Sequence, residues 1–387
     1  MVARPAVSSI QILTVVMAVG LLSACGSGGG ASPPSTSPTT SAGQSTAVTS
    51  TAASSAPIVE QTVSAYEPGP ITFDRAGRLF TSDCFAGYVL RLQPHAPPVI
   101  YAGTGVSSEA GSTPTQNAPR TSVQLDCPAG LAVDDAGRLL VAAHADNLVM
   151  AIGSDGRMVT VVGMGPPGTL TDDGALVGDG GPATGAQLQE PTQLAFDGQG
   201  NLYIADRDNH AVRRVDTQGV ITTVAGTGDP GFGGDHGPAT DAKLFRPQGV
   251  AVTPDGSLYI SDGDNARLRK VDRHGVITTI AGKGTKLPID PEQLLVDSEG
   301  LLIVADTSSV RRLSPAGVLT TIAGRPNADA TGAEPCSGIG GPATKAVITP
   351  VGLAIGPGGE LFMSTQTCGV LRLASDGTLR QYVAAPA

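Results

Sequence analysis

The sequence contains no tryptophan, and aromatic residues make up only 3% of its 387 positions. Sugars usually stack on Trp or Tyr rings, so this scarcity argues against a carbohydrate ligand. No run of Lys and Arg occurs, and the formal net charge is −10. This acidic balance argues against nucleic acid or anionic lipid headgroups as the main partner.

Several signatures of catalytic and metal sites are also missing. There is no Gly-x-Ser-x-Gly elbow, no C-x-x-C pair and no suitable cysteine nucleophile. No window has an apolar period of 3.6 residues, which excludes a helical solenoid. What the chain does contain is 52 Gly and 30 Pro, and these predict many turns between short strands.

The N-terminus has the pattern of a signal peptide over residues 1–24. Arg4 precedes an apolar stretch, Ile10 to Leu22, which is short for a membrane span of about 20 residues. The following Ser23-Ala24-Cys25 completes a sequence that resembles the bacterial lipobox, in which the cysteine is lipidated. The resemblance predicts a lipoprotein whose acyl chains, palmitate among them, hold Cys25 to the extracytoplasmic face of the cell membrane. An ordinary signal peptide with an incidental cysteine is the alternative.

Residues 25–57 are rich in Ser, Thr, Pro and Gly and contain too few apolar residues to form a core. We therefore expect the lipidated cysteine to be followed by a disordered tether, and the folded domain to occupy residues 58–387. The lipobox and the Ala/Gly/Thr-rich composition suggest that the protein comes from a high-GC actinobacterium.

Internal repeats decide the predicted fold. Residues 191–226 and 247–282 align end to end without a gap, and weaker copies begin at Pro68, Pro128, Pro291 and Pro350. Each unit has four β-like runs separated by turns, which in the third unit are Leu194–Phe196, Leu202–Ala205, Ala211–Val215 and Ile221–Ala225. Six units of four antiparallel strands predict an all-β, six-bladed β-propeller. An open array of the same units is the alternative.

The repeat pattern Pro-x-x-apolar-Ala-apolar-Asp-x-x-Gly-x-Leu-Tyr-Ile-Ala-Asp-x-x-Asn resembles the NHL repeat, from residue 68 to about 383. The third and fourth units match it closely, whereas the fifth lacks the Asn and the second and sixth lack the Asp. The resemblance implies a propeller that serves as a binding platform, as in extracellular sensors.

The recurrent polar residues of the repeat are expected to be structural. Asp206 with Asn209, and Asp262 with Asn265, follow the second strand of their units, where such side chains hold turns. Asp83 and Asp306 occupy equivalent places. Arg213, Arg269 and Arg311 recur in the third strand, and we expect them to be surface residues or partners between blades.

Three of the connections between units carry a Gly-rich motif, at residues 178–184, 234–240 and 338–344. Each should lead through a short helical turn to an apolar plug, at Leu188, Leu244 and Val347. These loops leave the propeller on the same face as the turns between second and third strands, and loops on a rigid scaffold often bind partners. Structural turns are the favoured interpretation of the motif, with anion nests or calcium ligands as alternatives. The fourth connection, 282–290, has lost the insert.

Four cysteines remain in the folded part, and they allow three pairings. Cys84 is expected in the turn between the second and third strands of the first unit, and Cys127 immediately precedes the second unit. Cys336 lies in the loop that enters the sixth unit, and Cys368 in the turn between that unit's second and third strands. Because all four map to the loop-bearing face of an exported protein, we predict the disulfides Cys84–Cys127 and Cys336–Cys368, each contributing about 2–4 kcal/mol.

Polar residues at the entrances of the inner strands are the candidates for binding a ligand in the central channel. They are Gln193, Gln248, Glu292 and Gln293. Metal-dependent lyases and lactonases on similar scaffolds use converging histidines, or Glu, Asn and Asp, around a cation. Here Glu292 is the only carboxylate of the set, which is too few for the oxygen ligands that a divalent cation requires. The five histidines are expected on opposite faces. We therefore assign no catalytic residue, metal ligand or cofactor, although a divalent cation at the axis remains an option.

The sequence thus predicts a monomeric, surface-tethered and non-catalytic recognition propeller. Its partners would be the membrane, through the lipid, and an unidentified envelope or extracellular protein. The alternative function is a metal-dependent hydrolase or lyase acting at the central channel, and a third is a structural role in the envelope without a specific ligand.

Overall fold

The computed structural model describes residues 61–64, 66–106, 114–165, 176–285, 287, 289–326 and 334–385. The chain separates into two units, 1–57 and 58–387. The predicted signal peptide, Cys25 and tether lie outside the described residues. None of the helices that the structure describes is long and apolar enough to cross a membrane.

Six antiparallel sheets form the blades of the propeller. The strands of the first three blades are β1 (Ile71–Phe73), β2 (Leu79–Asp83), β3 (Tyr88–Gln93) and β4 (Ala96–Ala102); β6 (Pro128–Val133), β7 (Leu139–Ala143), β8 (Leu148–Ile152) and β9 (Arg157–Val162); and β10 (Pro191–Phe196), β11 (Leu202–Asp206), β12 (Ala211–Val215) and β13 (Ile221–Ala225).

The other three blades have the same order. Their strands are β14 (Pro247–Val252), β15 (Leu258–Asp262), β16 (Arg267–Val271) and β17 (Ile277–Gly282); β18 (Pro291–Val296), β19 (Leu302–Asp306), β20 (Ser309–Leu313) and β21 (Leu319–Gly324); and β22 (Pro350–Ile355), β23 (Leu361–Thr365), β24 (Gly369–Leu373) and β25 (Leu379–Val383). A short strand that the sequence did not predict, β5 (Ala118–Pro119), adds a fifth strand to blade 2.

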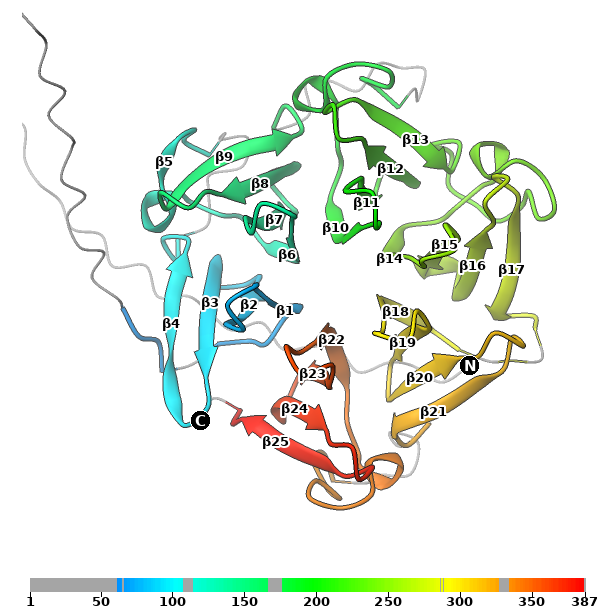
Figure 1. Ribbon diagram of the computed structural model, residues 1–387. Coiled ribbons are helices and arrows are strands. Elements are labelled where there is room, and N and C mark those ends of the chain that lie inside the picture. Colours follow the sequence, from blue (N-terminus) through cyan, green and yellow to red (C-terminus); the bar gives the residue numbers. More distant parts are fainter. Residues whose placement is uncertain are drawn as a thin grey trace, which may run out of the picture. The chain divides into compact units, whose positions relative to one another are not determined.

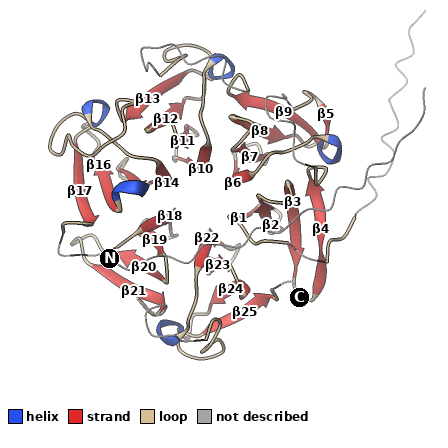
Figure 2. Cartoon of the chain, turned by 180° about the vertical axis from the view of Figure 1, so that it is seen from behind, coloured by secondary structure: helices blue, strands red, loops and turns tan. Residues whose placement is uncertain are grey.

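The blades close into a ring around a central axis (Figures 1 and 2). The first strand of each blade lies innermost, and β1 packs beside both β6 and β22. The predicted six-bladed propeller is therefore confirmed, and the open array is excluded. Radial repetition of this kind leaves only two short free edges per blade, one at the axis and one at the rim.

Apolar side chains fill the spaces between neighbouring blades. One such cluster joins Val212 of blade 3 to Val250 and Ile260 of blade 4, all with 0% exposure. The predicted helical turns are present as short 3₁₀ helices, Ala183–Gly185, Ala239–Asp241 and Ala343–Lys345. Leu188 and Leu244 are buried plugs as expected. In the last connection Ile348, which stands at the same distance from the 3₁₀ helix, is buried as well as Val347.

Buried ion pairs tie two of the long connections to blades 3 and 4, so of the two expected placements of the recurrent arginines the surface is excluded for Arg213 and Arg269. The side chain of Arg213 is fully buried, with Nη1 3.2 Å from Asp206 and Nη2 2.6 Å from Asp179 of the Gly-rich motif. Asn209 donates to the same Asp206 carboxylate at 2.8 Å, so this pair holds the turn as predicted. Blade 4 repeats the arrangement with Arg269, Asp262 and Asp235.

The structure pairs the cysteines as Cys84–Cys127 and Cys336–Cys368. The first bond joins the turn after β2 to the residue before β6, so it links blades 1 and 2. The second joins the loop that enters blade 6 to the turn after β23. The bonds therefore tie the first blade to the second and the last blade to the loop that enters it.

Replacing Arg213 with Ala should destabilise the protein by about 3–5 kcal/mol, because Asp206 would keep a buried charge without its cation. Guanidinium unfolding measures the change. Arg380→Ala is the matched control: Arg380 pairs with Asp376 in an exposed position, so its loss should cost less than about 1 kcal/mol. Equal effects of the two substitutions would contradict the structural role of the buried pair.

Candidate functional site

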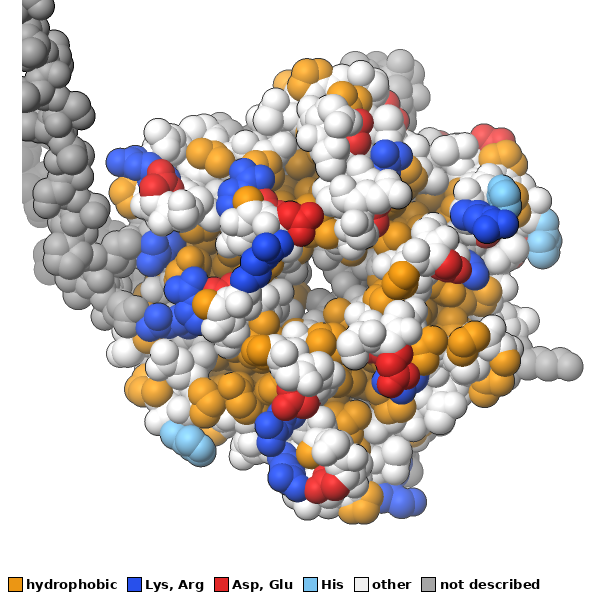
Figure 3. Space-filling view, in the orientation of Figure 1, with side chains coloured by type: hydrophobic (Ala, Val, Ile, Leu, Met, Phe, Trp, Pro, Cys, Tyr) orange, Lys and Arg blue, Asp and Glu red, His pale blue; other side chains and the backbone are white. Residues whose placement is uncertain are grey.

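The inner strands surround a cavity of about 330 Å³ on the axis. Its walls are the apolar residues of all six inner strands, together with Thr72, Gln193 and Gln293, and none of the lining residues is charged. Figure 3 shows the hollow at the centre of the ring from the side viewed in Figure 1. An uncharged wall disfavours a charged ligand inside the channel, because a charge without a partner is costly to desolvate.

The two glutamines that the sequence singled out use their amides within the protein. Gln193 reaches from blade 3 past blade 4 to blade 5, where its amide donates to the backbone oxygen of Leu294 and accepts from the backbone N–H of Leu294 at 3.0 Å. Gln293 accepts from the N–H of Leu353 in blade 6 at 2.7 Å. The amides therefore bond free backbone groups at the inner edges of other blades.

Gly249 makes room for this crossing. A Cβ at this position would lie 2.9 Å from Oε1 of Gln193 and 2.5 Å from the backbone oxygen of Glu292. At the equivalent Gly130 and Gly352 a Cβ would instead crowd backbone atoms of the next blade, Thr192 and Gly69. Glycine at this point of the repeat therefore allows neighbouring inner strands to approach closely.

The other two predicted residues lie one position earlier in their strands. The backbone oxygen of Gln248 accepts from Thr192 at 2.9 Å, which joins blades 3 and 4. Burial, together with the nearby Asp290 and Asp306 carboxylates, raises the pKa of Glu292 to about 7. Burial and neighbouring carboxylates also raise the pKa of Asp290. Glu292 therefore exchanges its proton near neutral pH.

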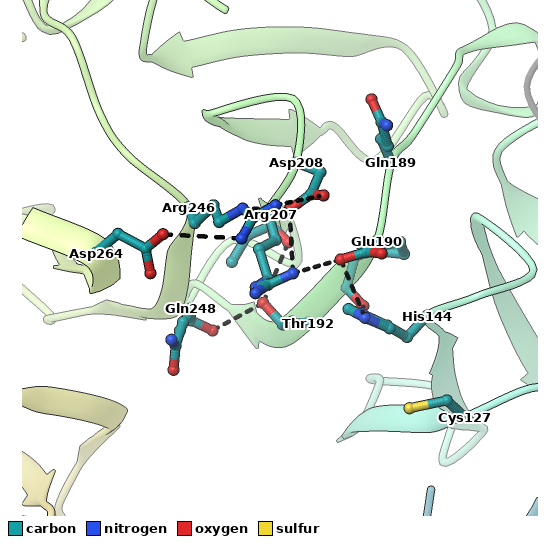
Figure 4. A network of polar contacts seen from close by, with 12 residues as sticks. Cys127, His144, Gln189, Glu190, Thr192, Arg207, Asp208, Arg246, Gln248 and Asp264 are labelled. Carbon is teal, nitrogen blue, oxygen red and sulfur yellow. Dashed lines mark hydrogen bonds and ion pairs between the residues drawn. The ribbon is translucent and has the colours of Figure 1, made fainter. Parts of the chain in front are cut away.

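A chain of charged side chains crosses the inner ends of blades 2, 3 and 4 (Figure 4). It begins at His144, whose Nε2 lies 3.4 Å from the Glu190 carboxylate. Arg207 pairs with the same carboxylate and, at 3.0 Å, with Asp208.

The chain continues into blade 4 through Arg246, which lies 3.1 Å from Asp208 and 3.8 Å from Asp264. We call these six residues the axial network: His144, Glu190, Arg207, Asp208, Arg246 and Asp264. They come from the turns between second and third strands and from the connections between blades. We call the face of the propeller that bears these loops the loop-rich face.

Two members of the axial network have an unusual backbone conformation. Glu190 and Arg246 have φ angles of 50° and 51°, and each precedes the proline that starts an inner strand. Cys127, at the equivalent place before β6, has a φ of 48°. Residues other than Gly rarely adopt the left-handed region, and a following proline favours extended backbone. Such strain persists where the surrounding structure enforces it, and it clusters at functional sites.

The His144 side chain is 18% exposed. Burial lowers its pKa, whereas the Glu190 carboxylate acts in the opposite direction. Its other nitrogen, Nδ1, lies 3.3 Å from the backbone oxygen of Pro191. Within the described ranges, no group of three or more His, Cys, Asp or Glu side chains is placed to hold a metal ion.

Sequence analysis identified Glu292 but missed the axial network. Glu190 and Arg246 immediately precede the aligned repeat, so a comparison that begins at the proline excludes them. A signal was nevertheless present. The residue before the proline is Cys127, Glu190, Arg246 and Asp290 in successive units, and a position that changes charge within a strict repeat indicates a role beyond the repeated fold.

Glu292→Gln should raise stability at alkaline pH. Because the folded pKa of about 7 exceeds the ordinary value, the unfolded chain loses this proton first, and the carboxyl costs stability progressively from about pH 4.5 to pH 7. We expect the variant to exceed the natural protein by up to about 3 kcal/mol at pH 8 and to match it at pH 4. Denaturant unfolding at both pH values measures this difference, with the exposed Glu334→Gln as control. A pH-independent difference would refute the shifted pKa.

Comparison with known proteins agrees with this architecture. A family model described as the teneurin NHL domain matches residues 154–230 and 227–291. Mouse teneurin-1 is 30% identical over 230 residues, which is 54% of this chain, and mouse teneurin-4 is 37% identical over 129 residues, which is 30% of it. The chain spans only 8% and 5% of the lengths of these relatives.

Solved structures give a likeness of fold alone. A streptogramin B lyase superposes with a TM-score of 0.51 at 12% identity, covering 85% of this chain and 87% of the lyase. A gluconolactonase from Xanthomonas campestris has a TM-score of 0.49 at 17% identity, covering 79% of this chain and 85% of the gluconolactonase. The six-bladed ring, the repeat pattern and the family model matched over residues 154–291 together support an NHL-repeat β-propeller.

Proposed function

We propose that this protein is a bacterial lipoprotein, held by acyl chains on Cys25 to the extracytoplasmic face of the cell membrane. Its propeller would act as a non-catalytic recognition module. The residues that support the anchor are the apolar stretch ending in Leu22-Ser23-Ala24-Cys25 and the Ser/Thr/Pro/Gly-rich segment that follows. The same features favour an origin in an actinobacterium.

The observation that carries the recognition role is the axial network on the loop-rich face. Glu190 and Arg246 hold strained backbone conformations, and their side chains take part in ion pairs that cross three blades. Both signs of charge lie within a few residues of each other, with side-chain exposures of 37% for Glu190 and 40% for Arg246. Such a surface suits a polar protein partner. Charged residues of the partner would form ion pairs with Glu190 and Arg246 in place of some of the pairs within the network.

Apolar side chains on the same loops strengthen the case for a protein partner. Phe85 is 78% exposed in the turn after β2, beside the Cys84–Cys127 disulfide. Phe232, on the connection that enters blade 4, is 46% exposed and stacks under the guanidinium of Arg267. Exposed aromatic anchors near paired charges are typical of protein interfaces. No specific observation on the described residues favours the metal-dependent hydrolase or lyase.

The anchor predicts that Cys25→Ala releases the protein from the membrane. In cells labelled with an alkyne fatty acid, we expect label on the natural chain and none on the variant, with the variant moving to the soluble fraction. Ser23→Thr is the matched control and should stay labelled. An unlabelled natural chain would contradict the lipoprotein assignment.

The recognition role predicts where a partner contacts the propeller. A photo-crosslinking amino acid at Phe85, on the loop-rich face, should yield a discrete adduct in intact cells. The same probe at Gln199, which is exposed in the turn between β10 and β11 on the opposite face, should not. Arg207→Glu should reduce the adduct at position 85 at least tenfold. Equal adducts from both faces, or no adduct from either, would refute recognition through this face.

A further inference from the structure

The outer strand of each blade has a free edge at the rim of the ring (Figure 1). In five blades another described segment of the chain covers this edge with main-chain hydrogen bonds. The covering segments are Gln61–Val63 on β4, β5 on β9, and the Gly-rich motifs around Pro182 on β13, Pro238 on β17 and Pro342 on β25.

Blade 3 shows how the cover is made. Gly180 donates to the backbone oxygen of Ile221 at 2.8 Å, and Ile221 donates to Gly181 at 3.1 Å. Ala183 then donates to the oxygen of Gly219 at 2.8 Å. Blades 4 and 6 repeat these three bonds through His236, Gly237 and Ala239, and through Gly340, Gly341 and Ala343.

Blade 5 differs, because no segment among the described residues covers its outer strand. Leu319 and Gly317 occupy the places of Ile221 and Gly219, and no described residue bonds to the outward backbone groups of Leu319 or to the oxygen of Gly317. The cause lies in the connection 282–290, which has lost the Gly-rich motif. Ile289 still fills the apolar plug position, with 7% exposure. The described residues of this connection therefore keep the packing between blades but supply no cover for the edge.

The side chains at the outer edge of blade 5 are of the same kind as those at the covered edges of blades 3 and 4. Val318 is 54% exposed, whereas its equivalents Val220 and Val276 are half-buried where Pro182 and Pro238 pair with them. The strand β21 reads LTTIAG, nearly identical to ITTIAG in the covered β17. Free edges are usually guarded by Lys or Pro, and β21 contains neither.

We propose that β21 is a strand-addition site, which binds an extended Gly-Pro-Ala segment supplied by another protein. The segment would take the place of the missing motif: two of its backbone groups bond Leu319, a third donates to Gly317, and its proline covers Val318. Main-chain bonds supply affinity in this mode of recognition, and side-chain contacts supply selectivity. The site lies at the rim and is independent of the axial network.

The natural cover of β17 provides a probe. The heptapeptide Gly-Asp-His-Gly-Pro-Ala-Thr, residues 234–240, is added up to about 1 mM, the range expected for a few main-chain bonds, to the isotope-labelled full chain. We expect saturable NMR shifts at Gly317, Val318 and Leu319. The same peptide with an N-methylated alanine loses the donor to Gly317 and should bind at least threefold more weakly.

Substitutions separate this site from general adhesion. Val318→Asp should weaken peptide binding at least tenfold, whereas Val106→Asp, at a valine that is 56% exposed on another loop, should leave it unchanged. Both variants are checked for an unaltered thermal melt. Absent shifts at 1 mM, shifts away from β21, or insensitivity to Val318→Asp would overturn the proposal. Self-association that Val318→Asp abolishes would also overturn it, because a second copy would then fill the edge.

Discussion

A propeller blade is a small sheet with two unpaired edges, and the rest of this structure depends on how those edges find hydrogen-bond partners. At the axis, side chains from other blades supply them: Gln193 bonds both backbone groups of Leu294, and Gln293 bonds Leu353. At the rim, connections between blades fold back as short covering segments on blades 2, 3, 4 and 6, and Gln61–Val63 covers blade 1. Unpaired backbone groups are costly when buried and promote aggregation when exposed, so loops and channel residues form part of the fold.

The buried ion pairs fix this arrangement at the rim. Arg213 is held by Asp206 within its own blade and by Asp179 on the covering segment, and Asp179 also accepts from the backbone N–H of Thr223 at 2.8 Å. One aspartate therefore positions the cover against the strand that it protects. The same connections carry Glu190 and Arg246 toward the axis. In each connection, the segment that covers the rim and the charged residue near the axis therefore belong to one loop, but Glu190 and Arg246 are not part of the hydrogen bonds that cover the edge.

The repeated features were predictable from the sequence because each has a local cause. Asp and Gly at fixed spacing set the turns, and the third blade has the predicted strands with shifts of three residues or fewer. The closed ring and the plugs at Leu188 and Leu244 followed from the same pattern. The sequence left open whether Arg213 lies on the surface or between blades, because its partner Asp179 lies 34 residues away on a loop. The axial network and the role of Gln193 depend on contacts between units, which no single repeat encodes.

The bond from Gln193 to Leu294 also bears on how the ring responds to stress. Solenoid repeats contact only their neighbours, and their stability is close to a sum of nearest-neighbour terms, so they can open from one end. Here blades 3 and 5 are coupled directly through the space left by Gly249. Blades 3 and 5 therefore stay joined where their contacts with blade 4 open, and these two blades should exchange their amide hydrogens together.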